Sequence, residues 1–288
     1  MAEWLNAIAL KAIRLRKESR RFESSSLRVY RRRLWRLGRV KTESQFRQVL
    51  QRVGLCLIFG SGDVPIPKVY DVAHDDADGW WNWKDHLQAK RQAYMGRLIR
   101  GKATLITMDL LPAFLALYYE QGGTPSYDEE HYYSRITQQA KWICDYLDRH
   151  GPCPADELRK AMKNLHGIGT AAYHKALLEL QRKFKVVTAG LVERTSWGAR
   201  VIGLFEQWVP DPIERQARRL KPEQARVLIL RSLLETAGVV PAASLDRITG
   251  WPKDQVTQAV ETLSEKNLVR REICPRRKQR DWIVWHAL

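Results

Sequence analysis

Cysteine and long apolar segments are scarce in this sequence of 288 residues. Its four cysteines, Cys56, Cys144, Cys153 and Cys274, show no Cys-x-x-Cys spacing of the kind that zinc ribbons and redox motifs use. His150 lies between two of them, but a fourth zinc ligand is not evident, so we expect reduced, mostly buried thiols and no metal site. No segment approaches the roughly 20 apolar residues of a membrane helix, and the N-terminus lacks the apolar core of a signal peptide. These absences predict a cytoplasmic protein without a membrane anchor.

A glycine-rich phosphate loop is also missing. The stretch Gly60-Ser61-Gly62-Asp63 is too short and wrongly placed to be the nucleotide cradle of P-loop or Rossmann proteins. The sequence therefore predicts no nucleotide cofactor, and no other cofactor is indicated.

Acidic residues are the minority among the charged ones. The chain has 49 Lys and Arg against 32 Asp and Glu, which gives a formal net charge of +17 and a pI near 9.9. So many positive side chains repel one another unless a polyanion neutralises them, and nucleic acid is the common polyanion. A hydrophobic content of 44% excludes wholesale disorder. We expect double-stranded DNA as the partner, with RNA or another protein as alternatives. The sequence does not indicate an oligomeric state.

The positive charge is densest near the N-terminus. Between Lys11 and Lys41 there are thirteen Lys or Arg and two Glu, interleaved with aliphatic and aromatic residues. This pattern predicts a basic helical arm over residues 1–41, with one side packed on the protein and the other facing phosphates. The alternative is an ordinary solvated charged face. The candidate DNA-binding residues of the arm are Arg31, Arg32, Arg33 and Arg36.

Residues 42–120 are expected to form a first domain resembling a winged helix. Thr42 is suited to cap a helix over residues 43–53, with Gln45 at the capping-box position, and Gly54 ends that helix. A short strand over residues 55–59 follows. An acidic loop over residues 71–78 comes next, which either makes structural ion pairs or supplies a general base. Its candidates for a catalytic carboxylate are Asp71, Asp75 and Asp76.

A tryptophan-rich stretch follows the acidic loop. Trp80, Trp81 and Trp83 are either core residues or a platform on which a base stacks. Periodicity predicts an amphipathic helix over residues 84–98 with a basic outer side, then a strand over residues 103–108, and a helix capped by Asp109. The basic residues proposed to contact DNA here are Lys84, Lys90, Arg97, Arg100 and Lys102.

The second half of the chain repeats one pattern of elements. The same pattern, three helices followed by a β-hairpin, is predicted for residues 134–209 and again for residues 221–288. These are the elements of a winged helix. Polar linkers over residues 120–134 and 210–221 precede the two repeats. The sequence thus predicts a mainly α fold with small β-hairpins (α+β), built from tandem winged-helix domains. Candidate DNA-binding residues on the recognition helix, the first wing and the second wing are Thr170, His174, Lys175, Arg194, Arg276, Arg277, Lys278 and Arg280.

A family resemblance is visible in the tryptophan-rich stretch. The order Trp81-x-Trp83-Lys84, then "AKRQAYMGRLI", then "DLLPAFLALY" resembles the bacterial winged-helix DNA glycosylases that unhook interstrand crosslinks and alkylated purines, the AlkZ/YcaQ-type family. The resemblance covers about residues 40 to 120 and implies winged helices arranged around a duplex. It also implies a Gln-x-Gln or Gln-x-Asp pair that positions the attacking water. In this sequence that pair aligns with Leu57 and Phe59, whose side chains neither orient water nor accept a proton.

Three functions fit these observations. The first is a duplex-binding relative of the glycosylases in DNA repair, without their base-excision chemistry. The second is an active glycosylase for alkylated or crosslinked bases, with a carboxylate at a new position. The third is a transcriptional regulator whose paired winged helices read an operator.

Overall fold

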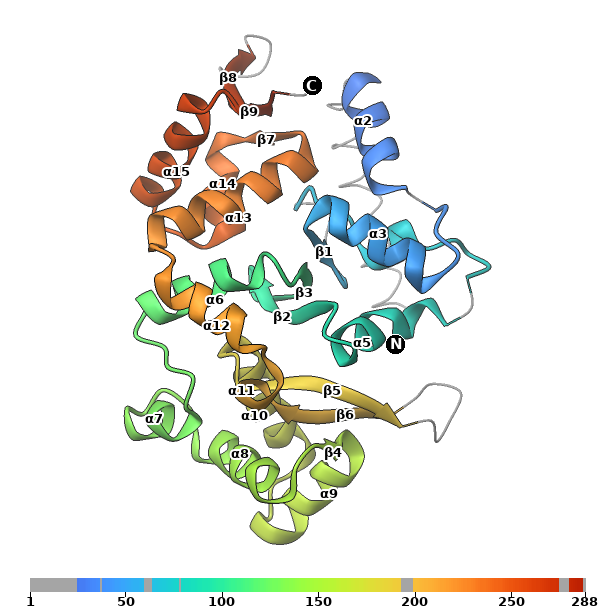
Figure 1. Ribbon diagram of the computed structural model, residues 1–288, viewed down its shortest axis with the longest axis vertical. Helices are drawn as coiled ribbons and strands as arrows, with labels where there is room; N and C mark the ends of the chain where they lie inside the picture. Colours follow the sequence, from blue (N-terminus) through green and yellow to red (C-terminus); the bar gives the residue numbers. More distant parts are fainter. Residues whose placement is uncertain are drawn as a thin grey trace, which may run out of the picture.

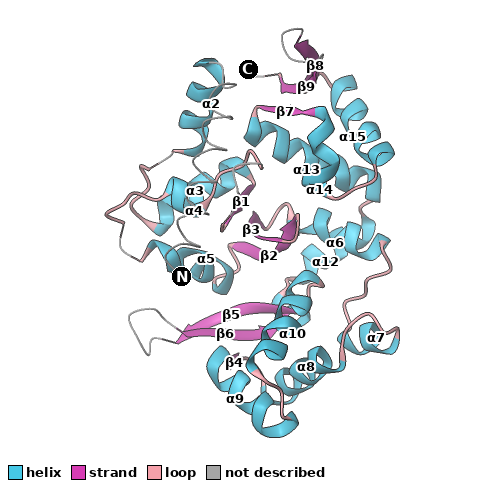
Figure 2. Ribbon diagram, turned by 180° about the vertical axis from the view of Figure 1, so that it is seen from behind, coloured by secondary structure: helices cyan, strands magenta, loops and turns pink. Residues whose placement is uncertain are grey.

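The computed structural model describes residues 25–36, 38–59, 64–77, 79–192, 199–274 and 280–286. This part of the chain is mainly helical and contains three small antiparallel sheets of three strands each (Figures 1 and 2). Each sheet has its first strand on one edge and its last strand in the centre, in the orders β1-β3-β2, β4-β6-β5 and β7-β9-β8. The mainly helical class with small hairpins is therefore confirmed.

The first unit runs from α3 to α6 and follows the basic helix α2. Thr42 caps α3 as predicted, because its hydroxyl accepts from the Gln45 amide at 3.3 Å, and Gly54 ends the helix with a φ of 74°. The predicted strand over residues 55–59 is shorter, and Asp71 lies in a short helix instead of a loop. The elements are α2 (Ser25–Trp35), α3 (Glu43–Val53), β1 (Leu55–Leu57), α4 (Val69–Val72), η1 (Trp80–Asn82), α5 (Trp83–Ala89), β2 (Ala93–Ile99), β3 (Lys102–Thr107) and α6 (Leu111–Glu120).

The helix predicted over residues 84–98 is wrong in its second half. The helix α5 ends at Ala89, Arg91 has a φ of 55°, and residues 93–99 form the strand β2, which pairs with β3. Packing around Tyr94 favours the strand. The Tyr94 ring packs against aromatic rings of the second unit and also lies over Gly96, where a side chain would collide with it. Asp109 does not cap α6, whose N-cap position is Leu110.

The second unit runs from α8 to α11. The three helices and the β-hairpin predicted for residues 134–209 are present, and after the hairpin residues 205–208 form a helical turn that buries Phe205 and Trp208. The stretch over residues 120–134, predicted as a linker, contains the helix α7. The elements are α7 (Tyr127–Tyr132), α8 (Gln138–His150), β4 (Cys153–Pro154), α9 (Ala155–His166), α10 (Thr170–Arg182), β5 (Val186–Val192), β6 (Ala199–Leu204) and α11 (Phe205–Trp208).

The third unit runs from α13 to β9. The second predicted linker, residues 210–221, contains the helix α12, which packs on α6 and buries Ala217. Both linker predictions missed a helix because these helices are short and mostly exposed, so few apolar residues mark them. The elements are α12 (Asp211–Arg219), α13 (Pro222–Ala237), β7 (Val239–Pro241), η2 (Ala242–Ser244), α14 (Leu245–Thr249), α15 (Lys253–Glu265), β8 (Val269–Cys274) and β9 (Arg280–Trp285).

The third unit packs directly on the first. One apolar core contains buried residues of β1, β3, α6 and α13. Thr236 of α13 donates its hydroxyl to the Val53 carbonyl at 2.6 Å, and Trp35 of α2 donates its indole N–H to the Thr236 carbonyl at 3.0 Å. Because these polar groups are buried and paired, they fix α2 and α3 against α13.

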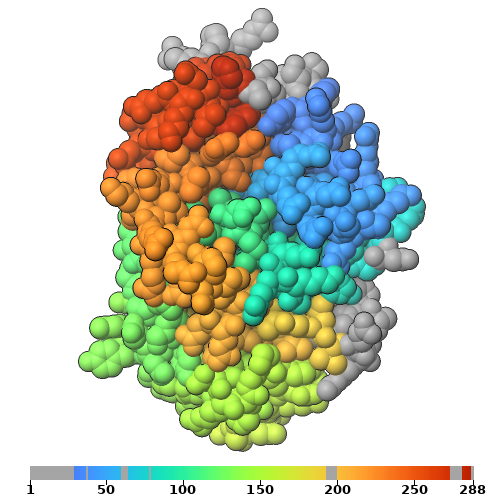
Figure 3. All heavy atoms as spheres, viewed as in Figure 1, coloured from blue at the N-terminus to red at the C-terminus, as the bar shows by residue number. Residues whose placement is uncertain are grey.

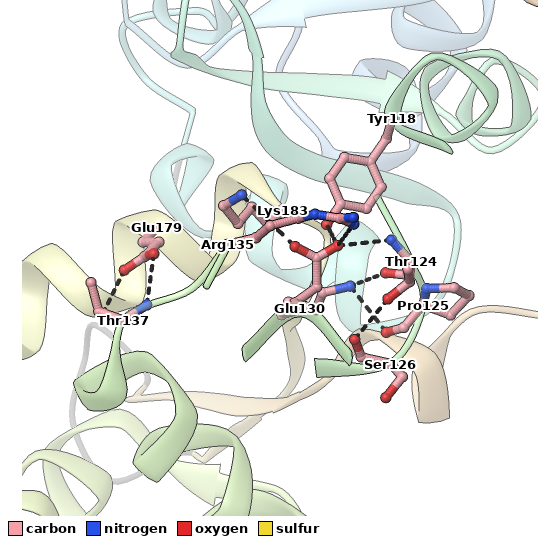
Figure 4. A network of polar contacts seen from close by, with 10 residues as sticks. Tyr118, Thr124, Pro125, Ser126, Glu130, Arg135, Thr137, Glu179 and Lys183 are labelled. Carbon is pink, nitrogen blue, oxygen red and sulfur yellow. Dashed lines mark hydrogen bonds and ion pairs between the residues drawn. The ribbon is translucent and has the colours of Figure 1, made fainter. Parts of the chain in front are cut away.

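A buried carboxylate fixes the second unit against the first (Figure 4). Glu130 of α7 accepts from the Tyr118 hydroxyl at 2.6 Å and from the Thr124 amide at 2.8 Å. The cations of Arg135 and Lys183 lie 3.7 and 3.8 Å from its two oxygens. This network connects α6, the segment after it and the end of α10, and thereby orients the second unit.

Some sequence predictions lie outside the described residues. They are the first 24 residues of the basic arm, the loop over residues 60–63, and the wing residues Arg194, Arg276, Arg277 and Lys278. Arg280 begins β9, but its side chain is likewise not described. In the described part of the chain no helix is long and apolar enough to cross a membrane.

Candidate nucleic-acid interface

A pocket of about 460 Å³ lies between the first and second units. Its floor and walls come from α5 and the β2–β3 hairpin of the first unit, and from the end of α10 and β6 of the second. Figure 3 shows the two units in direct contact where the blue-green part of the chain, which contains α5, meets the yellow part. The lining residues are Ile58, Phe59, Trp81, Asn82, Lys84, Asp85, Met95, Arg97, Gly101, Lys102, Ala103, Gln181 and Arg200.

Helix α5 is fixed in place by the second unit. The Gln88 side chain accepts from the Thr188 amide at 3.2 Å, and the Gln88 carbonyl accepts from the Trp208 indole at 3.2 Å. Gln88 itself is buried. The pocket residues on α5 are therefore positioned by contacts with both units.

Aromatic side chains form one wall of the pocket. Phe59 is 58% exposed, and its ring centroid lies 4.9 Å from that of Trp81. Trp80 meets Trp81 edge to face at 5.6 Å. By contrast, Trp83 is buried and stacks on Phe46 in the core. Trp83 is thus a core residue, whereas Trp81 faces the pocket.

A buried amine and a buried carboxylate lie side by side beneath this wall. The ammonium group of Lys84 donates to Asp85 Oδ2 at 2.6 Å and to the Trp81 carbonyl at 2.7 Å, and lies 4.1 Å from the Trp81 ring centroid. The two side chains are 8% and 4% exposed. Burial lowers the pKa of Lys84 below its usual value, Asp85 opposes this shift, and Arg200 adds to it. Asp85 Oδ1 is buried and has no hydrogen-bond partner among the described residues.

Cations surround the pocket. Arg97 and Lys102 come from the two strands of the hairpin, and Arg200 comes from β6. Burial lowers the pKa of Arg97, and the neighbouring Arg182 lowers it further. The Nε atom of Arg97 is also buried without a hydrogen-bond partner in the described part of the chain. Positive charge in a partly desolvated site favours an anionic ligand.

The carboxylates proposed from the sequence lie elsewhere. Asp71 pairs with Lys68 at 3.4 Å, Asp76 is 81% exposed on its side chain, and Asp75 is also exposed. None of the three is among the described residues that line the pocket. Sequence reasoning missed Asp85 because its position next to a lysine on a helix resembles an ordinary surface ion pair. The adjacent tryptophans were the available signal.

Leu57 and Phe59, the two positions at which the resemblance places the polar pair, differ in environment. Leu57 is fully buried in β1, and Phe59 opens onto the pocket. Neither supplies a polar atom there, so a water in this pocket has to be oriented by other groups.

The candidate DNA-binding residues whose side chains the structure describes fall into three groups. Lys84, Arg97 and Lys102 line the pocket, and Lys84 is buried there. Another group lies on the surface: Arg32, Arg33, Arg36, Arg100, Thr170, His174 and Lys175 are exposed. The remaining two make structural contacts. Arg31 donates to the Ala237 carbonyl at 2.9 Å, and Lys90 pairs with Glu43 at 2.7 Å.

The cysteines and histidines do not gather into a metal site in the described residues. Cys56, Cys144 and Cys153 are buried free thiols, as expected, and burial raises the pKa of each. His150 stacks on Tyr146, and its Nδ1 atom lies 2.9 Å from the Tyr146 carbonyl.

Comparison with known proteins gives one family and one solved structure. A family model described as "AlkZ related" matches residues 40–250. The match therefore extends well beyond the segment in which the resemblance is visible by eye. The DNA glycosylase AlkZ of Streptomyces sahachiroi has a similar structure, with a TM-score of 0.53, 12% identity, and coverage of 92% of this chain and 71% of that chain. At such low identity the likeness is one of fold. No curated protein sequence matches significantly.

Proposed function

This chain belongs to the AlkZ-related family, and we propose that it binds double-stranded DNA in DNA repair, with its three units acting as winged helices around the duplex. One observation carries the proposal: the pocket between the first two units combines an exposed aromatic wall with the cations of Arg97, Lys102 and Arg200. Aromatic rings stack on an unpaired base, and arginine and lysine neutralise phosphates. The net charge of +17 supports the same partner.

In this proposal the pocket receives a nucleotide that has left the stack. Its volume lies within the range of small-molecule sites, roughly 300 to 1,000 Å³. Trp81 and Phe59 stack on the extruded unit, while Arg97, Lys102 and Arg200 hold the flanking phosphates. Base excision through the family's polar pair is not part of the proposal, because Leu57 and Phe59 occupy those positions.

The test measures binding to a fluorescent duplex at several salt concentrations. Replacing both Arg97 and Lys102 by Gln removes two phosphate contacts. We expect affinity to fall by about tenfold or more, and the slope of log K against log salt to become smaller by about 2. Arg219→Gln is the matched control, since Arg219 is an exposed arginine on α12, outside the pocket. Equal affinities of the double variant and the wild type would refute the assignment of the interface.

A second candidate function is an active glycosylase with a relocated carboxylate. It is favoured by Asp85, whose unpaired Oδ1 atom lies at the pocket and has the chemistry to orient or deprotonate a water. If this holds, an alkylated duplex acquires abasic sites in the presence of the wild type but not of Asp85→Asn. A sharp preference for one undamaged sequence would instead favour the third candidate, a transcriptional regulator.

A further inference from the structure

We propose that Lys84 and Asp85 act as an abasic-site lyase: the Lys84 amine forms an imine with the aldehyde of an abasic sugar, and Asp85 removes the proton that leads to strand cleavage. The inference rests on the proposed function, since DNA has to enter the pocket. It assigns a covalent activity to a pair of residues whose buried position a simple phosphate contact does not explain.

The first argument is the position of the amine. A lysine that only contacts phosphates stays at the surface, where its ammonium group is hydrated. Lys84 is instead buried at the pocket, between Asp85, the Trp81 carbonyl and the face of the Trp81 ring. Desolvation by burial lowers its pKa, which increases the share of neutral amine, the form that attacks a carbonyl.

The second argument is the unpaired oxygen of Asp85. Oδ2 accepts from Lys84, whereas Oδ1 is buried and has no hydrogen-bond partner in the described residues. A buried carboxylate oxygen without a donor is costly, and such groups concentrate where a ligand completes the site. Oδ1 is thus available to accept a proton from a bound molecule, within one residue of the nucleophile.

The third argument is the match between the pocket and an abasic nucleotide. The ring-opened sugar is small, carries no base, and is flanked by two phosphates. The pocket offers room for the sugar beside Lys84 and cations at its edge, namely Arg97, Lys102 and Arg200. The aromatic pair of Phe59 and Trp81 covers the space that the lost base leaves open.

The reaction balances without a metal or an oxidant. The neutral amine of Lys84 adds to C1′ of the sugar aldehyde, and the carbinolamine takes up a proton and loses water to give an iminium ion. Asp85 then removes a proton from C2′. The C3′–O bond breaks, and its electron pair leaves with the 3′ phosphate, which becomes the 5′ phosphate end of the downstream strand. Water finally hydrolyses the imine of the unsaturated sugar and returns the amine.

The experiment traps the imine. A labelled duplex with one abasic site, made by removing a uracil, is incubated with the full chain and sodium borohydride, which reduces the imine to a stable covalent adduct. We expect an adduct with the wild type and at least a tenfold lower yield with Lys84→Arg, which keeps the positive charge but lacks an aliphatic amine. Lys266→Arg, at an exposed lysine on the third unit, is the matched control and is expected to trap as the wild type does.

The variant Asp85→Asn separates the role of Lys84 in imine formation from the role of Asp85 in removing the C2′ proton. It is expected to retain adduct formation and to lower strand cleavage without borohydride, because the imine forms but the C2′ proton stays in place. Mass spectrometry of the digested wild-type adduct identifies the modified lysine directly. That measurement decides the question even if a variant fails to fold. An adduct on any lysine other than Lys84, or equal trapping by Lys84→Arg, would overturn the inference.

DNA binding is measured in parallel, so that a failure of the lyase proposal can be distinguished from a failure of the proposed DNA binding. The probe is a duplex with a tetrahydrofuran abasic analogue, which has no aldehyde and forms no imine. If the wild type binds this probe but gives no adduct with the natural site, the lyase is refuted and DNA binding stands. If it binds no duplex at all, the proposed function fails as well.

Discussion

Two tyrosines, the fully buried Tyr94 and the partly buried Tyr118, differ in whether their hydroxyl groups have a hydrogen-bond partner. Tyr94 is fully buried against Phe184 and Phe205, and its hydroxyl has no hydrogen-bond partner among the described residues. Tyr118 donates its hydroxyl to the buried Glu130 carboxylate at 2.6 Å. Aromatic packing holds the first ring and a charge-assisted hydrogen bond holds the second.

The two tyrosines therefore predict opposite responses to the same change. Tyr94→Phe removes an unsatisfied polar group and is expected to raise the free energy of unfolding by about 1 kcal/mol. Tyr118→Phe leaves a buried carboxylate oxygen with one donor fewer and is expected to lower it by about 2 kcal/mol. Urea denaturation followed by tryptophan fluorescence measures both. A loss of stability in both variants would show that the Tyr94 hydroxyl is satisfied in solution.

At the scale of elements, the β2–β3 hairpin determines which basic side chains face the pocket. As a helix, residues 84–98 would place Lys90 and Arg97 on the same outer face. Because α5 ends at Ala89, the chain turns and β2 sends Arg97 to the pocket instead. Helix propensity favoured the longer helix, but pairing with β3 and the burial of Tyr94 outweigh the few tenths of a kcal/mol per residue that propensity contributes.

The short elements show the same competition between local preference and packing. The α3 helix was predicted from a cap at Thr42 and a stop at Gly54, and both signals act within a few residues of the helix ends. The sequence pattern does not predict α7 or α12. In α12 only Ala217 is buried, so the helix is positioned by its packing against α6 and has no apolar face that the sequence reveals.

At the scale of the whole molecule, Lys185 lies in the contact between the first two units. Its ammonium group donates to the Thr124 and Pro125 carbonyls, which belong to the segment between α6 and α7. Burial lowers its pKa to about 8, and the charges of Glu130, Cys144 and Glu206 oppose this shift less strongly, while Lys183 adds to it. The contact between the units therefore contains a lysine that titrates in an accessible range of pH.

The sign of the pH effect follows from the lowered pKa. In the unfolded chain lysine has a pKa of about 10.4, so the unfolded state holds the proton more tightly. The cost of burying the charge is present in full below pH 8 and disappears as pH rises towards about 10.4. The stability of the wild type relative to Lys185→Met is thus expected to increase between pH 8 and pH 10, by at most about 3 kcal/mol. Urea denaturation of both proteins at pH 7, 8, 9 and 10 measures the difference. A flat difference would contradict the lowered pKa.

The sequence by itself determined the charge, the class of elements and the family. The excess of 17 positive charges, the caps and the helix-and-hairpin patterns are local or additive properties, so they can be summed or recognised along the chain. The resemblance over about residues 40 to 120 likewise depends on residue order alone, and the family match over residues 40–250 agrees with it.

Only the tertiary structure decided the candidate site. Phe59, Asp85 and Arg200 are far apart in the sequence and meet because α5 rests on β5, held by Gln88. Whether Lys84 lies at the surface or in a pocket depends on how α5 packs, and α5 packs on β5, a strand about 100 residues further along the chain. Desolvation, which sets the chemistry of an amine, is a property of the packed molecule and leaves no local pattern in the sequence.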